Sequence, residues 1–276
     1  MKKIYYFLLS LFLCVCLSSL INLSANEACF GISYNPTTGV ETKITYEEYN
    51  KYNNSINTCG VIDTDDRYVI RDTTDAHYKA VCYVLAYYGK DCYRGSGILV
   101  GKKVLLTASH LLYNKERGWA SSVVVYPAYN NGDAPYGGAL WAYTSIGKYY
   151  DTKNENDDWG IVKLATSIGE KTGYYNISTT LKKGDKITLF SYPSDMSTKM
   201  VVSPSTVTSL YTYKFRHKCD LVGGSSGGGI LNSNLEVVGI QSTETYTETN
   251  GVKNYMYNTA CRISKYIVGY VAEANS

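Results

Sequence analysis

The chain has 276 residues, of which 45% are hydrophobic, 13% aromatic and 18% charged. This apolar content excludes a wholly disordered chain. The 27 Lys and Arg residues against 24 Asp and Glu give a formal charge of +3, too balanced to indicate a nucleic-acid or anionic-membrane partner. With 29 Tyr, 24 Gly and only 5 Pro, the composition favours an all-β fold over a helical one.

Residues 1–25 have the pattern of a secretory signal peptide. Lys2 and Lys3 precede an apolar run over residues 4–21, and small residues follow as far as Ala25. A membrane anchor is the alternative, because the run is near the length that spans a bilayer. Polar residues dilute the end of the run and favour the signal peptide. We therefore expect a secreted, extracellular protein with no membrane attachment once the signal is removed.

Residues 26–60 are polar and rich in turn residues, with no sustained apolar period. We interpret this stretch as a pro-segment or a loose N-terminal extension. From about Val61 the texture changes to short apolar runs separated by Gly, Asn and Asp. After the signal peptide and the segment 26–60, we therefore predict one domain over residues 61–276.

Six cysteines follow the signal, and an even number in an exported chain favours disulfides. We prefer a disulfide between Cys82 and Cys92, which flank a hairpin-like stretch over residues 84–89. The other pairings stay open, as does the possibility that all six remain reduced. The absence of a CxxC pair predicts no zinc site. The six are Cys29, Cys59, Cys82, Cys92, Cys219 and Cys261.

Many short predicted strands at near-regular spacing indicate a sandwich or a barrel. Only the end of the chain has a helical period, which predicts a C-terminal helix over residues 263–272. The predicted strands cover residues 81–88, 97–106, 122–126, 160–164, 186–192, 229–231 and 237–241.

Three segments carry residues suited to catalysis. His110 follows the predicted strand that ends at Leu106, Asp158 directly precedes the predicted strand at Gly160, and Ser226 lies within a glycine-rich turn. A serine hydroxyl is a poor nucleophile unless a base lies within hydrogen-bond reach and an acid orients that base. The order His, Asp, Ser with a Gly-x-Ser-Gly-Gly turn is that of the chymotrypsin-like arrangement.

This pattern predicts Ser226 as the nucleophile, His110 as the general base and Asp158 as the acid that orients the imidazole. The backbone N–H groups of Gly224 and Ser226 are predicted to form the oxyanion hole, since glycines tolerate the backbone angles that such a turn requires. The other two histidines, His77 and His217, lie outside these segments and are interpreted as structural.

Each segment alone is more often a tight loop, a turn acid or a structural histidine, and their joint occurrence in the required order favours an enzyme. A protease-like binding protein that has lost turnover is the alternative function. An esterase of the α/β-hydrolase type requires the order Ser, Asp, His and alternating strands and helices, and the sequence has neither.

The chain resembles the glutamyl endopeptidase branch of the chymotrypsin-like serine proteases. Residues Val61–Arg67 and Asp72–Tyr78 resemble the mature N-terminus of that family. The resemblance also covers the histidine and aspartate strands and the stretch Ile187–Asp195. It implies two six-stranded antiparallel barrels with the active site between them. It also implies a precursor that is cleaved at Gly60–Val61, without a metal or an organic cofactor, acting as a monomer on protein or peptide substrates.

The resemblance leaves the residue preference at the cleaved bond open. The positions that read an acidic side chain in this branch correspond here to Gln241 and Leu221, and the new N-terminus at Val61 would help to bind it. Neither Gln241 nor Leu221 carries a charge to compensate a buried carboxylate. Asp220 lies six residues before Ser226, where trypsin-type enzymes hold the acid that binds Lys or Arg. Its alternative interpretation is a structural acid beside Cys219.

Overall fold

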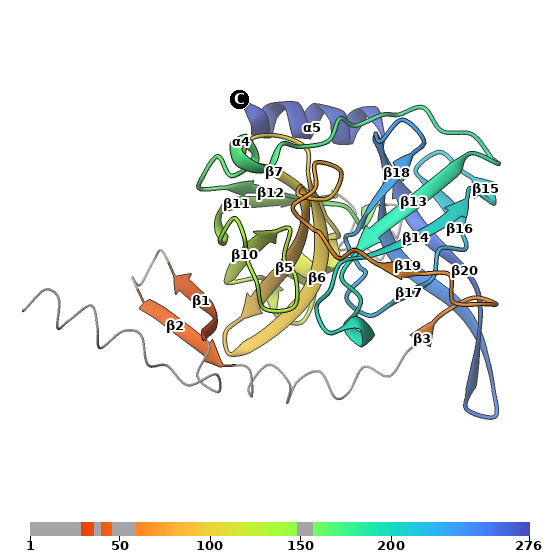
Figure 1. Cartoon of the computed structure of the whole chain (residues 1–276), viewed down its shortest axis with the longest axis horizontal. Helices are drawn as coiled ribbons and strands as arrows, with labels where there is room; N and C mark the ends of the chain where they lie inside the picture. The colour runs from red at the N-terminus through yellow and green to blue at the C-terminus, as the bar shows by residue number, and fades with distance from the viewer. Residues whose placement is uncertain (1–28, 36–39, 46–58, 148–156) are drawn as a thin grey trace, which may run out of the picture.

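The structure is a computed structural model that describes residues 29–35, 40–45, 59–147 and 157–276. The predicted signal peptide lies outside the described residues. The predicted all-β character is confirmed, and the strands gather into two main groups (Figure 1). None of the helices in the described part of the chain has the length and hydropathy needed to cross a membrane.

The first group is a closed antiparallel barrel in the order β10-β11-β12-β7-β6-β5. Nearly every residue of β5 is buried, because Val, Leu, Ala and Tyr side chains alternate without a polar face. The buried residues of the barrel form one continuous apolar core, which also takes in residues of the second group of strands. Its strands are β5 (Val81–Tyr88), β6 (Asp91–Leu99), β7 (Val104–Thr107), β10 (Ser122–Pro127), β11 (Ala139–Ile146) and β12 (Gly160–Leu164).

The second group is an eight-stranded antiparallel sheet in the order β15-β16-β20-β19-β18-β13-β14-β4. Only one closed six-stranded barrel is therefore found among the described residues. The second group stays open because its terminal strands, β15 and β4, pair with β16 and β14 and not with each other. The strands are β4 (Tyr68–Val69), β13 (Lys186–Ser191), β14 (Val201–Thr206), β15 (Ser209–Leu210), β16 (Lys214–His217), β18 (Gly229–Asn232), β19 (Val237–Thr249) and β20 (Val252–Arg262).

Short elements complete the described chain. The predicted C-terminal helix is present as α5 (Lys265–Asn275), which packs its buried residues Ile267, Val271 and Ala274 into the barrel core. Ser264 caps it by accepting a hydrogen bond from the amide of Ile267. The others are α3 (Ser109–Leu112), α4 (Gly169–Thr172), the 3-10 turn η4 (Ser194–Met196), and the paired strands β1 (Cys29–Asn35) with β2 (Val40–Thr45), β3 (Cys59–Gly60) with β17 (Leu221–Val222), and β8 (Tyr113–Asn114) with β9 (Gly118–Trp119).

One sequence-based expectation is wrong in detail. The single strand expected over residues 97–106 is the end of β6, a turn at residues 100–103 and then β7. Within residues 26–60, interpreted from the sequence as a pro-segment or a loose N-terminal extension, the structure describes the β1–β2 hairpin and β3.

The expected disulfide between Cys82 and Cys92 is also wrong, because both are free thiols. In the β5–β6 ladder, Cys82 lies opposite Gly97 while Cys92 lies opposite Tyr87. The two cysteines are therefore offset by five residues along the sheet, or about 17 Å at the usual strand rise. A disulfide requires Cα atoms within about 7 Å of each other.

Candidate active site

His110 lies in the one-turn helix α3, directly after barrel strand β7. Ser109 ties this helix to the opposite segment, because its hydroxyl donates to the carbonyl oxygen of Trp159 at 2.5 Å. Thr107 is buried and donates its hydroxyl to the carbonyl oxygen of Ser96 at 2.7 Å. These contacts fix the histidine backbone at the rim of the barrel, beside the start of β12.

Asp158 contacts His110 through two hydrogen bonds. The backbone N–H of His110 donates to Asp158 Oδ1 at 3.0 Å, and His110 Nδ1 lies 2.9 Å from Asp158 Oδ2. The carboxylate is almost fully buried, while the imidazole keeps 32% of its surface exposed. This arrangement holds the ring with Nδ1 toward the acid, which leaves Nε2 available to accept a proton.

Burial and charge act in opposite directions on this pair. Burial alone would lower the pKa of His110, but the adjacent Asp158 carboxylate outweighs it and the pKa is raised above its ordinary value. Burial alone would raise the pKa of Asp158, and its attraction to His110 and its hydrogen bonds instead lower it. The acid is therefore ionised at neutral pH, as an orienting carboxylate must be.

A further residue, Ser242 on β19, completes the hydrogen bonding of the acid. Its buried hydroxyl donates to Asp158 Oδ2 at 2.6 Å, so a residue of the open sheet bonds directly to a residue of the barrel segment. Sequence reasoning missed this serine. Its only signal is its place on the strand that follows the glycine-rich turn, and that position alone does not identify a partner for Asp158.

The glycine-rich turn places Ser226 in a tight bend. Gly224 and Gly227 have φ values of +97° and +80°, which side chains rarely adopt. A Cβ at Gly224 would also lie 2.6 Å from the carbonyl oxygen of Tyr192. Ser96 holds the turn from the barrel, donating its hydroxyl to Gly224 O and its amide to Ser226 O, both at 2.8 Å.

The amide groups of this turn divide into two sets. Those of Ser225, Gly227 and Gly228 donate to backbone carbonyl oxygens. Those of Gly224 and Ser226 donate to no acceptor within the described residues. The two unengaged N–H groups are the pair that the sequence predicts as an oxyanion hole, and an anion at this point would receive hydrogen bonds without displacing existing ones.

Ser226 and His110 line one cavity of about 350 Å³. No hydrogen bond joins Ser226 Oγ and His110 Nε2 in the described structure, and such contacts often tighten only when substrate is bound. Both expected pocket residues Leu221 and Gln241 line this cavity. Its remaining lining residues are Val222, Gly223, Ser242, Thr243 and Glu244.

Gln241 differs in detail from the sequence-based expectation. It is buried, and its Nε2 donates to the backbone carbonyl oxygens of Thr243 and Thr259 at 3.2 and 3.5 Å. Its amide N–H groups are therefore engaged with the protein backbone. Nearby His217 is also buried, and burial lowers its pKa to about 4, so that this histidine is neutral at pH 7. His77, by contrast, is exposed and bonded to Asp75.

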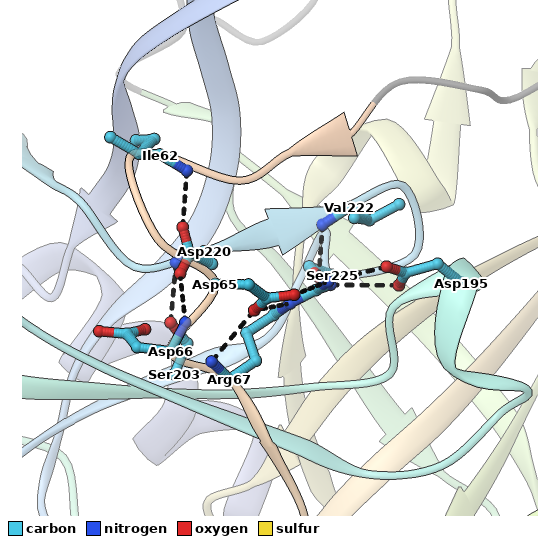
Figure 2. Close-up of polar contacts among 9 residues, drawn as sticks. All are labelled: Ile62, Asp65, Asp66, Arg67, Asp195, Ser203, Asp220, Val222 and Ser225. Atoms are coloured by element: carbon cyan, nitrogen blue, oxygen red, sulfur yellow. Dashed lines mark hydrogen bonds and ion pairs between the residues drawn. The ribbon is translucent and has the colours of Figure 1, made fainter.

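Asp220 does not line the cavity. Its carboxylate instead accepts the backbone amides of Ile62, at 2.7 Å, and Asp66, at 3.1 Å (Figure 2). Its own amide donates to Ser203 Oγ at 2.7 Å. Asp220 therefore lies against the N-terminal segment and not where it would meet a substrate Lys or Arg. This position agrees with the alternative interpretation of Asp220 as a structural acid. Val61, half-buried, lies one residue before this anchor and outside the cavity lining.

Glu244, which sequence reasoning missed, is the carboxylate that lines the cavity. Burial raises its pKa, against the opposing effect of Lys253. In the sequence it belongs to an alternating run of Thr, Glu and Tyr over residues 243–249, which resembles an ordinary solvent-exposed strand face. No group of three or more His, Cys, Asp or Glu among the described residues is arranged to hold a metal ion.

Comparison with known families identifies one that spans the site. The family described as trypsin-like peptidase domain matches residues 95–240, more than half of the chain. The matched region contains all three predicted catalytic residues: His110, Asp158 and Ser226. It begins on β6 of the barrel and ends on β19 of the open sheet.

Three relatives are similar over most of the chain. A Bacillus subtilis protein named extracellular metalloprotease is 29% identical over 80% of this chain and 73% of its own length. A Bacillus licheniformis glutamyl endopeptidase is 29% identical over 74% of this chain and 66% of its own length. A solved structure of a Glu endopeptidase in complex with MPD is 25% identical, with a TM-score of 0.68, covering 78% of this chain and 99% of that one. The resemblance to the glutamyl endopeptidase branch is thereby confirmed.

Proposed function

Since this chain belongs to the trypsin-like peptidase family of serine endopeptidases, we propose that it is secreted as a precursor and cuts peptide bonds through an acyl-enzyme intermediate. The observation that carries the proposal is the His110–Asp158 pair on the cavity that also exposes Ser226. The backbone N–H groups of Gly224 and Ser226, which donate to no acceptor within the described residues, support the same acyl-transfer chemistry.

In the proposed mechanism, Ser226 Oγ attacks the carbonyl carbon of the peptide bond while His110 Nε2 accepts its proton. The negative charge that develops on the carbonyl oxygen is stabilised by the N–H groups of Gly224 and Ser226. His110 then gives the proton to the leaving amine. Water then loses a proton to His110 and attacks the acyl carbon. As the bond from that carbon to Ser226 Oγ breaks, His110 returns the proton to Oγ, and the acid product leaves. Asp158 remains ionised throughout and stabilises the charged imidazole.

Protein or peptide substrates follow from this chemistry, and we propose that the preferred side chain before the cleaved bond is acidic. The names of two relatives, glutamyl endopeptidase and Glu endopeptidase, support this preference. So does Asp220, because its carboxylate is engaged by Ile62 and Asp66 outside the cavity and is not presented to a basic side chain.

Maturation is proposed to follow removal of residues 1–25 and then cleavage between Gly60 and Val61. The β3 strand supports a change at this point, because it pairs with β17 and so lies against the wall of the cavity. The name extracellular metalloprotease of one relative supports export. We further propose that the mature enzyme is a monomer.

A fluorophosphonate probe tests the proposed nucleophile. The matured wild-type protein should be labelled, Ser226→Ala should not be, and Ser233→Ala, which removes an exposed serine in the turn after β18, should be labelled normally. Peptide cleavage should be lost in the same variant that loses labelling. A matured, folded wild-type protein that takes up no probe would favour the alternative of a binding protein without turnover.

A further inference from the structure

The chain that follows the proposed cleavage point is anchored one residue beyond it. The Asp220 carboxylate accepts the amides of Ile62 and Asp66 from opposite oxygens, and the acid is 2% exposed (Figure 2). These hydrogen bonds involve neither Gly60 nor Val61. Cutting the bond between those two residues therefore leaves the anchor intact.

Arg67 holds the same segment at its other end. Its guanidinium lies between Asp65 and Asp195, 2.8 Å from each, and the arginine side chain is only 3% exposed (Figure 2). Asp195 belongs to η4, far along the sequence. Val61 precedes the residues that Asp220 and Arg67 hold, and neither of these contacts involves it.

Glu244 lies beside the bond that is cut. A Cβ placed on Gly60 would be 2.6 Å from Glu244 Oε2 and 2.7 Å from the carbonyl oxygen of Leu221. Because the Val61 nitrogen is two bonds from the Gly60 Cα, it lies within about 7 Å of that carboxylate oxygen in the uncut chain. The freed amine thus starts beside an acid and remains tethered there.

The other charged groups around Val61 are accounted for. Asp63 lies 3.1 Å from Lys218 Nζ, Asp220 holds the two amides, and Asp66 contributes one of them. On β20, Lys253 lies over the ring of Tyr246 and attracts Glu244 without a salt bridge to it. Among the described residues Glu244 has no ion-pair partner, so its carboxylate is the acceptor available to a new cation.

We propose that cleavage creates an ion pair between the α-ammonium of Val61 and the carboxylate of Glu244, at the wall of the substrate cavity. This inference rests on the proposed maturation. In that hydrolysis the C–N bond breaks and water supplies the new oxygen, which leaves a carboxylate on Gly60 and an ammonium on Val61. The Gly60 carboxylate is repelled by Glu244, which favours departure of β3, while the Val61 ammonium is attracted to it.

The pair sets how strongly the cavity accepts an acidic substrate side chain. An uncompensated Glu244 repels a substrate carboxylate, whereas an ammonium beside it neutralises that charge. The ammonium has three N–H donors, so it can bond to Glu244 and still offer a donor to the substrate. Glu244 is then a specificity-determining residue that moderates the preference for acidic side chains.

The test uses the matured chain with its amines dimethylated by ¹³C-formaldehyde, so that the α-amine is followed by NMR as the pH is changed. The α-amine of the wild type should titrate at a higher pH than that of an equally dimethylated Val-Ile-Asp reference peptide, because the ion pair favours the charged form. In Glu244→Gln the midpoint should fall by about 1 pH unit or more. Glu248→Gln, an exposed acid on the same strand, should match the wild type.

The same three proteins, without dimethylation, are compared on peptides that carry Glu or Gln before the cleaved bond. Removing the Glu244 charge should raise the ratio of kcat/KM for Glu over Gln by about tenfold, since the substrate carboxylate loses a repulsive neighbour and gains an undivided ammonium. Glu248→Gln should leave this ratio unchanged.

Two results would overturn the ion pair. One is a wild-type α-amine that titrates at the same pH as that of the dimethylated reference peptide, which needs no variant to observe. The other is a Glu244→Gln protein whose midpoint or Glu preference does not change in the stated direction. Intact mass and N-terminal sequencing separate these from a failure of maturation, because a matured chain that starts at another residue overturns both proposals, whereas a Val61 start with a normal α-amine overturns only the ion pair.

Discussion

At the scale of single residues, the site depends on how completely Asp158 is bonded. Its Oδ1 accepts the backbone amide of His110, and its Oδ2 faces both the imidazole Nδ1 and the Ser242 hydroxyl. A nearly buried carboxylate with three donors around it remains ionised and fixed in direction. The imidazole therefore carries its proton on Nδ1 and turns the basic Nε2 toward the cavity.

Asp158→Asn should lower kcat by about 10⁴, because the amide can present a donor to Nδ1 and favour the wrong imidazole tautomer. The measurement is steady-state hydrolysis of a peptide substrate. Asp157→Asn is the matched control and should stay within about tenfold of the wild type. The reverse ranking of these two variants would assign the orienting role to Asp157.

The pH dependence of kcat/KM should reflect the charge of His110. Because the pKa of His110 is raised, the histidine stays protonated and inactive as a base to a higher pH than a free imidazole. The acid limb of the profile should thus have its midpoint above about 6.5. In Asp158→Asn, where burial acts without the opposing carboxylate, the residual activity should have its midpoint at lower pH. A wild-type midpoint below that of free imidazole would contradict this expectation.

The three catalytic candidates could be predicted from the sequence, because the glycine-rich turn and the order of the residues along the chain mark them. The direction in which a side chain points could not be predicted in this way. Asp220 occupies the sequence position of a substrate-binding acid, yet amides about 150 residues earlier in the chain engage its carboxylate. Glu244 belongs to a polar strand, and only its position across from β3 and β17 places it on the cavity.

At the scale of elements, burial decides how well a strand is predicted. The apolar runs of β5 and β12 match their predicted bounds because both lie in the barrel core. The hairpin of β19 and β20 extends well beyond the predicted strand because its outer half carries exposed Thr, Glu and Tyr. Those side chains give no apolar period, although β-branched and aromatic residues favour an extended backbone.

Gly269→Ala should stabilise the protein by about 1 kcal/mol, because glycine in an exposed helix interior costs about that much relative to alanine. Gly269 lies within α5, and nothing lies within 4 Å of an added Cβ. The melting temperature should rise by about 2–4 °C. Gly89→Ala is the matched control: its added Cβ also meets nothing within 4 Å, but its φ of +65° strains alanine, so stability should fall. Equal shifts in both variants would show that backbone conformation does not decide the outcome.

At the scale of the whole molecule, the barrel and the open sheet each supply part of the site. His110 and Asp158 come from the barrel side, while Ser226 and Ser242 come with the strands of the open sheet. Ser96 on β6 bonds to the turn around Ser226 from the barrel. The resemblance implies a second closed barrel, and the described residues show that group of strands as an open sheet, because its terminal strands β15 and β4 do not pair with each other.

Arg67→Gln should destabilise the protein by about 1–3 kcal/mol, the usual contribution of hydrogen bonds to charged groups. The change removes the guanidinium that joins Asp65 to Asp195 while the two acids remain partly exposed. Urea unfolding of the Ser226→Ala protein measures the loss without self-digestion. Arg71→Gln, at an exposed arginine, should unfold like its parent. If both variants unfold at the same urea concentration, Arg67 does not support the N-terminal segment.

The hydrogen bond from Ser242 to Asp158 also has a consequence for the order in which the site forms during synthesis of the chain. A ribosome delivers the histidine and the aspartate long before it has made the nucleophile or the last two long strands. No nascent fragment that ends before β19 can form this bond, so Asp158 gains its third hydrogen-bond donor only when translation is nearly finished.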